Sequence, residues 1–157
     1  MKPLEMIQAN PNEICVKRGF DAPLELVWRA FTEPEFVKRW LTGPPGHTMP
    51  ICEIDLREGG QWRYVWNIPV DEMIAYGSYQ EVVKHQRIVN TETFAQWPDD
   101  SSVVTTLFEQ QKDQTLVTML IAYGTEATRN MVLQTGMTEG IEMSYERLDA
   151  LMPVYSV

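Results

Sequence analysis

The sequence predicts an α+β domain in which a curved antiparallel sheet packs against one long C-terminal helix. Residues 49–123 show several strand-like segments separated by short turns, and residues 137–152 carry apolar side chains along a single helical stripe. Two short helical patterns lie between the first strand and the others. A sheet has to bury one face, and the long helix is the obvious cover. We expect one domain over residues 1–157, with an N-terminal tail over 1–11 and a core over about 12–152.

The first strand is expected at Glu13–Phe20, where apolar residues partly alternate with charges. Pro23 then suits the first position of a helix, because its missing N–H would have no partner there. Apolar residues at helical spacing continue this helix to Phe31. Thr32 and Glu35 form the pattern of a capping box, which predicts the start of a second short helix.

Six more strands are expected after a loop at residues 42–46. They are expected over residues 49–56, 61–67, 73–83, 87–94, 103–110 and 115–123. Short turns between successive strands favour an antiparallel arrangement. Trp62, Tyr64 and Trp66 share one face of their strand, because side chains alternate along a strand. Gly77, in the middle of the next strand, predicts a bulge or a bend in the sheet.

The last third of the chain predicts a short helix over residues 126–133 and a long amphipathic helix over 137–152. At about 100° per residue, one stripe of the long helix contains Met137, Gly140, Ile141, Ser144, Tyr145, Leu148, Leu151 and Met152. The opposite stripe contains Glu139, Glu142, Glu146 and Asp149. The simplest interpretation of the acidic stripe is a solvated surface, and a partner-binding surface is the alternative.

Charge and composition exclude several classes of function. The chain has 13 basic and 22 acidic residues, a net charge of −9, which would repel phosphate backbones, so nucleic-acid binding is not expected. No apolar run is long enough for a membrane span, and no signal peptide is evident, so we expect a cytoplasmic protein. Cys15 and Cys52 do not make a disulfide framework, although they could meet on neighbouring strands. His47 and His85 lack metal-ligand spacing, so no metal or cofactor is expected.

The aromatic residues either fill the core or line a pocket for a small molecule. A curved sheet around one helix leaves a space, and Gly140 and Ser144 on the buried stripe either allow close packing or leave room. A space of roughly 300 Å³ or more would favour ligand binding. The residues expected to line it are Trp28, Phe31, Trp40, Trp62, Tyr64, Trp66, Tyr76, Phe94, Thr106, Phe108, Met137, Ile141 and Tyr145.

Glu92 and Tyr145 are the only candidates for acid or base chemistry. If Phe94 points inward, Asn90 and Glu92 do so too, and burial would raise the pKa of the Glu92 carboxyl. The simpler interpretation, which we favour, points Asn90, Glu92 and Phe94 outward and places Val89 inside. No sequence motif of a nucleophile, a phosphate loop or a metal protease is present, so an enzyme is not the favoured interpretation.

Several segments resemble a known superfamily. The segment Phe20–Glu35 resembles the opening of the START-like superfamily, which includes the birch-pollen allergen and the polyketide cyclases. Five further segments of the chain resemble one branch of this superfamily, which is named after the activator of the heat-shock protein 90 ATPase. These segments are Trp40–Pro44, Asp55–Gly60, Gly77–Val82, Thr135–Gly140 and Tyr145–Leu151. The resemblance covers residues 13–152 and implies a helix-grip fold. In that fold a seven-stranded antiparallel sheet curls around a long C-terminal helix and leaves a deep cavity for hydrophobic small molecules.

The resemblance implies no single activity, because members of the superfamily bind lipids, sterols or polyketides and a minority catalyse cyclisation or hydrolysis. We therefore expect binding of a hydrophobic or aromatic small molecule. The alternatives are a cyclase or hydrolase type of enzyme, with Glu92 or Tyr145 as acid or base, and a protein-interaction module. The co-chaperone that names the branch carries an additional domain that we do not expect here, so a chaperone partner is not expected. A homodimer is compatible with each alternative.

Overall fold

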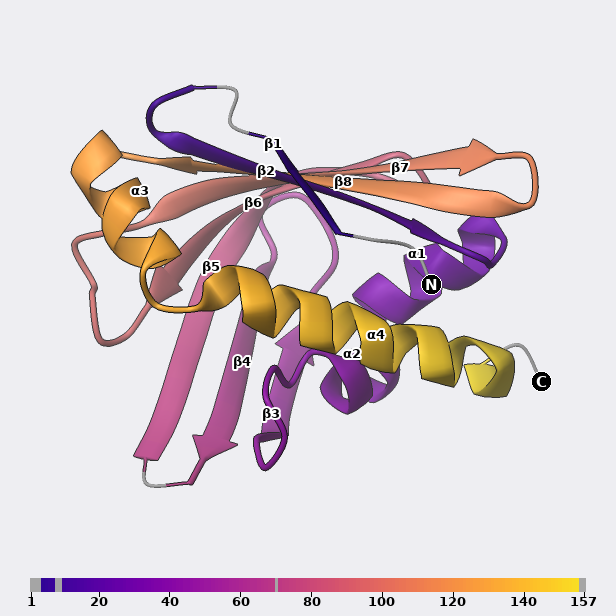
Figure 1. Ribbon diagram of the computed structural model, residues 1–157, viewed down its shortest axis with the longest axis horizontal. Coiled ribbons are helices and arrows are strands. Elements are labelled where there is room, and N and C mark those ends of the chain that lie inside the picture. Colours follow the sequence, from indigo (N-terminus) through magenta and orange to yellow (C-terminus); the bar gives the residue numbers. More distant parts are fainter. Residues whose placement is uncertain (1–3, 8–9, 70, 156–157) are drawn as a thin grey trace.

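The computed structural model describes residues 4–7, 10–69 and 71–155, and its strands form one antiparallel sheet with the order β1-β2-β8-β7-β6-β5-β4-β3. Figure 1 shows this sheet curving around the long helix α4. The strands are β1 Glu5–Ile7, β2 Glu13–Phe20, β3 Thr48–Ile54, β4 Gln61–Ile68, β5 Asp71–Val83, β6 Arg87–Phe94, β7 Ser102–Gln111 and β8 Gln114–Tyr123. The helices are α1 Leu24–Thr32, α2 Pro34–Trp40, α3 Glu126–Leu133 and α4 Met137–Tyr155. This arrangement confirms the α+β helix-grip fold.

The sheet has eight strands, one more than the seven expected. The additional strand β1 lies within the expected N-terminal tail, where Glu5 pairs with Lys17 and Ile7 pairs with Cys15 of β2. Within the expected tail, residues 1–3 and 8–9 lie outside the described residues. The two ends of the strand order are β1 and β3, and β3 contains Pro50 and a register shift between Thr48 and Ile51.

The helices α1 and α2 connect β2 to β3 and pack near the C-terminal half of α4 (Figure 1). The expected capping box is wrong. Thr32 is the last residue of α1, and its hydroxyl donates to the Trp28 carbonyl at 2.7 Å. The N-cap of α2 is Glu33, which makes no side-chain capping bond, and α2 begins at Pro34. A proline at the first turn starts the helix without a cap, because its nitrogen has no hydrogen to satisfy.

Polar side chains on more than one face of α4 hold the helix to its surroundings. The Ser144 hydroxyl is buried and accepts a hydrogen bond from the backbone N–H of Gly43 at 2.9 Å. The Arg147 guanidinium donates to the Thr42 hydroxyl at 2.5 Å and to the Gly43 carbonyl at 3.1 Å. Asp149 was expected on the solvated stripe but binds the buried Arg18 of β2. The helix is therefore anchored to the 42–43 loop and to the sheet.

In the part of the chain that the structure describes, no helix combines the length and the apolar character that crossing a membrane requires.

Candidate functional site

A cavity of about 140 Å³ lies between the curved sheet and α4, and it is not fully closed from solvent. Strands β4 to β8 form one wall, and α4 with the α1–α2 region forms the other. The lining residues are Phe31, Val37, Trp40, Leu41, Trp62, Tyr64, Tyr79, Ile88, Asn90, Glu92, Val104, Thr106, Phe108, Met119, Ile141 and Tyr145. The volume does not reach the roughly 300 Å³ that we expected to favour ligand binding, so only a small molecule would fit the site.

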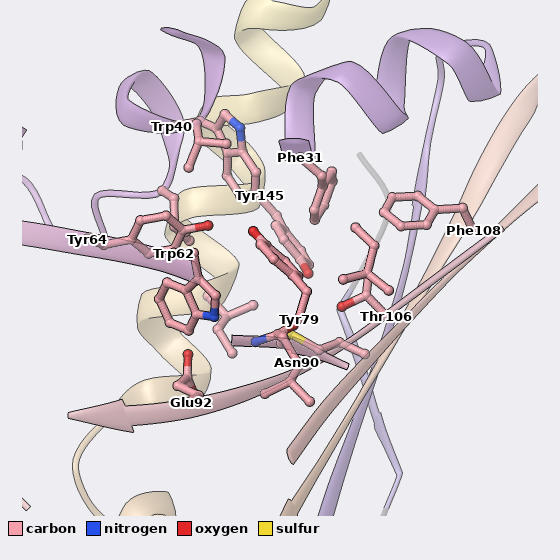
Figure 2. A pocket seen from close by; sticks show the side chains of 16 residues that line it. Phe31, Trp40, Trp62, Tyr64, Tyr79, Asn90, Glu92, Thr106, Phe108 and Tyr145 are labelled. Atoms are coloured by element: carbon pink, nitrogen blue, oxygen red, sulfur yellow. The ribbon is translucent and has the colours of Figure 1, made fainter. Parts of the chain in front are cut away.

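Eight of the residues expected to line a pocket do line this cavity. They are Phe31, Trp40, Trp62, Tyr64, Thr106, Phe108, Ile141 and Tyr145. The aromatic rings among them come from five elements, which are α1, α2, β4, β7 and α4 (Figure 2). The helix α4 brings them together, because Tyr145 packs on Phe31 and on Trp40 with ring centroids 6.0 and 5.9 Å apart.

Five expected lining residues lie outside the cavity. Trp28 is buried behind Phe108, with ring centroids 5.0 Å apart, and fills the core. The indole N–H of Trp66 donates to the Leu41 carbonyl at 2.7 Å, so this ring supports the α2–β3 loop. Tyr76 is 41% exposed, because it faces away from the helix. Phe94 and Met137 are partly buried and pack against the core without lining the cavity.

Tyr79 and several aliphatic residues of the lining were not predicted from the sequence, and Asn90 was considered only in the alternative in which Phe94 points inward. Tyr79 faces inward where β5 loses its regular register with β6 between Tyr79 and Glu81, and no pattern in the sequence locates this shift. Val104 could have been found, because it shares the parity of Thr106 and Phe108 on one strand. The remaining missed residues are Val37, Leu41, Ile88 and Met119.

Glu92 and Asn90 both line the cavity, so the favoured interpretation, in which these two side chains point outward, was wrong. Ile88, Asn90 and Glu92 alternate along β6 and all three line the cavity. Figure 2 shows the Glu92 side chain directed toward the Trp62 ring. Burial among apolar groups raises the pKa of the Glu92 carboxyl to about 7, because the charged form loses its hydration there. This carboxyl changes its protonation state near neutral pH.

The neighbouring N–H groups that could have bound Glu92 are used elsewhere. The Trp62 indole N–H and the Asn90 side-chain amide both donate to the Thr91 carbonyl, each at 3.1 Å. A Cβ atom added to Gly77 would lie 1.9 Å from this carbonyl oxygen, so only glycine allows β5 to approach it this closely. Among the described residues, the Glu92 carboxyl has no hydrogen-bond or ion-pair partner.

Three tyrosine hydroxyls also face the cavity. Burial raises the pKa of Tyr64, Tyr79 and Tyr145, so these groups stay neutral at physiological pH. None of the three hydroxyls forms a hydrogen bond within the described ranges 4–7, 10–69 and 71–155. The cavity therefore combines aromatic walls with a few polar groups that are free to bind.

A second hollow of about 640 Å³ lies on the surface beside α2 and the 42–50 loop. It is more open than the cavity, and basic residues are part of its lining. Two of them have partners: Lys38 pairs with Glu35 at 3.0 Å, and Arg147 binds loop oxygens. The hollow lacks the enclosed apolar walls of a small-molecule site, so the internal cavity is the stronger candidate.

The structure offers no other obvious chemistry. No group of three or more His, Cys, Asp or Glu side chains within the described residues could hold a metal ion. Cys15 and Cys52 are free thiols on β2 and β3, strands that are not neighbours in the sheet. Arg57 binds Asp55 at 2.9 Å beside the Gly59–Gly60 turn.

The model of one protein family, described as "Activator of Hsp90 ATPase homolog 1-like protein", matches residues 21–153. The chain belongs to this family. The match agrees with the resemblance to the heat-shock protein 90 ATPase activator branch of the START-like superfamily. The fold of this superfamily is known for ligand binding. None of the curated proteins matches the sequence.

Solved structures share the fold of this Hsp90 ATPase activator-like chain. A protein from Rhodobacter sphaeroides is 23% identical with a TM-score of 0.91, over 97% of this chain and 99% of the other. A protein from Nitrosomonas europaea is 25% identical with a TM-score of 0.82, over 96% and 99% of the two chains. An AHSA1-like protein from Aeromonas hydrophila is 18% identical with a TM-score of 0.74, over 88% and 92%.

Proposed function

We propose that the protein binds a small apolar or aromatic molecule in the cavity between the sheet and α4. The observation that supports this most directly is the space of about 140 Å³ that the surrounding aromatic rings leave unfilled. Protein interiors are normally close-packed, and an engineered apolar cavity of about 150 Å³ in another protein binds benzene. The space therefore suits a ligand with one aromatic ring or an equivalent aliphatic group.

The free polar groups of the lining favour binding over simple core packing. Buried polar side chains in a sealed core normally have hydrogen-bond partners. Here the hydroxyls of Tyr64, Tyr79 and Tyr145 share one cavity with the Glu92 carboxyl, and none is paired within the described chain. A mostly apolar lining with a few polar groups is the usual composition of a small-molecule site.

The proposal is tested by measuring thermal stabilisation with single-ring compounds such as toluene, phenol and benzyl alcohol. We expect at least one of them to raise the Tm, because a ligand that binds only the folded state stabilises it. Val104→Phe places a ring in the cavity and should abolish the shift. Val103→Phe is the matched control, because Val103 is exposed on the other side of β7 and does not line the cavity.

Failure of every single-ring compound to shift the Tm would contradict the proposal. If Val104→Phe does not fold, Thr106→Met offers a milder way to fill the same cavity from the same strand. A normal ligand response in both variants would show that the compounds bind elsewhere.

A second candidate function is acid–base catalysis on a bound apolar substrate, as in a cyclase or hydrolase. It is supported by the pKa of Glu92, which at about 7 lets the carboxyl accept or donate a proton near neutral pH. Turnover of small aromatic esters is the test: Glu92→Gln should abolish it while ligand binding persists. Equal turnover in the wild type and the variant would contradict this role.

The proposed location is the cytoplasm. Both cysteines are free, and Cys15 is buried. Free thiols are usual in a reducing compartment, where disulfides rarely persist. A fluorescent fusion of the protein that accumulates outside the cytoplasm would contradict this proposal.

A further inference from the structure

We propose that the polar end of the cavity selects an amine, so that the ligand is a small apolar amine whose ammonium group binds the Glu92 carboxylate. This inference rests on the proposed function and specifies the class of ligand. It is carried by three features of the site: the free carboxylate, the absence of a cationic side chain in the lining, and the aromatic faces beside Glu92.

The first feature is the unpartnered carboxylate. Glu92 lies in the cavity wall on β6, and the side-chain N–H donors of Trp62 and Asn90, which line the same cavity, both bind the Thr91 carbonyl. A carboxylate that loses hydration without gaining a partner is destabilised, and a ligand that supplies the partner recovers part of this cost. An ammonium group provides both the opposite charge and the hydrogen-bond donors that the carboxylate lacks.

The second feature is the charge of the lining. Among the residues that the structure describes, no lysine, arginine or histidine lines the cavity. The titratable groups that surround Glu92 are Tyr64 of β4, Tyr79 of β5 and Tyr145 of α4 in the lining, with Tyr123 of β8 close enough to act on the carboxyl. Burial raises the pKa of each of these tyrosines, so they remain uncharged, and Glu92 is the only charge-bearing group among the described residues that line the cavity.

The third feature is the aromatic surface next to the carboxylate. The rings of Trp62 and Tyr64 lie with centroids 4.7 Å apart, and both line the cavity with Glu92. Aromatic faces attract cations, most strongly where water is excluded. An anion would instead meet a carboxylate and the negative faces of these rings, in a chain whose net charge is −9. The site therefore favours a cation over an anion of the same size.

The experiment compares benzylamine with benzyl alcohol by calorimetry on the full chain. The two probes have the same ring and nearly the same size, and only benzylamine carries a positive charge. Since burial raises the pKa of Glu92 to about 7, raising the pH from about 6 to about 8 should strengthen benzylamine binding about tenfold. Benzyl alcohol affinity should stay flat or fall, because only the protonated carboxyl could donate to its oxygen.

Glu92→Gln removes the charge and keeps the shape of the side chain. We expect this variant to lose at least about tenfold in benzylamine affinity at about pH 8, and circular dichroism shows whether it is folded. Glu109→Gln is the matched control, because Glu109 is exposed and lies outside the cavity. If Glu92→Gln does not fold, Glu92→Asp keeps the charge and should retain pH-dependent benzylamine binding.

The outcomes distinguish failure of the amine site from failure of the proposed function. Benzyl alcohol binding without pH-dependent benzylamine binding would overturn the amine site and leave the proposed function standing. Binding of neither probe, nor of any other single-ring compound, would overturn both. Tighter binding of benzoate than of benzylamine at about pH 8 would also overturn the amine site.

Discussion

Arg18 of β2 holds Asp149 of α4 in a two-pronged ion pair. The Nη1 atom of Arg18 lies 3.0 Å from Oδ1 of Asp149, and Nη2 lies 2.5 Å from Oδ2. The Arg18 side chain is only 2% exposed, and its guanidinium carbon lies 4.9 Å from the centroid of the Phe20 ring. Asp149 is thus the partner that allows a positive charge to be buried under the long helix.

Asp149→Asn should destabilise the protein by about 2 to 3 kcal/mol, because Arg18 would keep its buried charge and lose its anionic partner. This figure is reduced from that of a fully buried pair, since Asp149 is 33% exposed. Urea denaturation followed by circular dichroism measures the change. The double variant Arg18→Met, Asp149→Leu should be more stable than Asp149→Asn, because it removes the unpaired charge. A neutral effect of Asp149→Asn would show that water solvates Arg18.

Gly77→Ala should prevent folding or lower the stability by more than about 3 kcal/mol, since the added Cβ would lie 1.9 Å from the Thr91 carbonyl oxygen and 2.8 Å from the Trp62 indole nitrogen. Gly140→Ala is the contrasting change, because a Cβ there meets nothing within 4 Å. Alanine inside a helix is favoured over glycine, so Gly140→Ala should stabilise the protein by up to about 1 kcal/mol. Thermal unfolding of both variants measures the contrast, and a similar Tm for the two would contradict it.

Glu92 should make the protein less stable as the pH rises from about 4.5 to about 7. Burial raises the pKa of this carboxyl from 4.5 to about 7. The folded state therefore binds more protons than the unfolded state between these values, and the stabilisation that is present at low pH is lost as the pH rises through 7. Over this window Glu92→Gln should gain up to about 3 kcal/mol relative to the wild type. Denaturant titrations at several pH values test this, and parallel stability curves for the two proteins would refute it.

Cys52 should react slowly with alkylating reagents in the folded protein. Burial raises the pKa of the Cys52 thiol to about 12, so almost none of it is thiolate at neutral pH. Iodoacetamide followed by mass spectrometry should modify neither cysteine in buffer and both in denaturant. Rapid modification of Cys52 in the native state would contradict this expectation.

The sequence was sufficient for the fold, because alternating strands and a long amphipathic helix dominate the pattern. It did not reveal β1, whose three residues Glu5–Ile7 are all exposed and therefore carry no inward-facing signature. It also misplaced the start of α2, since Thr32 bonds back to Trp28 instead of capping the next helix. Both errors arise where one local hydrogen bond or a short pairing decides the structure and hydrophobic burial does not.

The cavity was harder to predict than the fold, because its lining depends on which strand faces turn inward. On β7 the parity of Thr106 and Phe108 was sufficient. On β6 the opposite orientation was favoured, because burying Val89 is simpler than burying the charge of Glu92. Ser144, expected as a small residue that either allows close packing or leaves room, accepts a hydrogen bond from the backbone of Gly43. Such predictions assume that polar side chains point to solvent, and polar groups that belong to a site or make a loop contact do not follow this assumption.

The proline of β3 has a consequence for how copies of this protein meet. As an outer strand, β3 exposes one side of its backbone, and such a row of free N–H and C=O groups can recruit a strand from another molecule. Pro50 removes one donor from this strand, and the register shift between Thr48 and Ile51 bends it out of the regular ladder. Strand β3 is therefore a poor template for a ninth strand, which protects this edge of the sheet from aggregation.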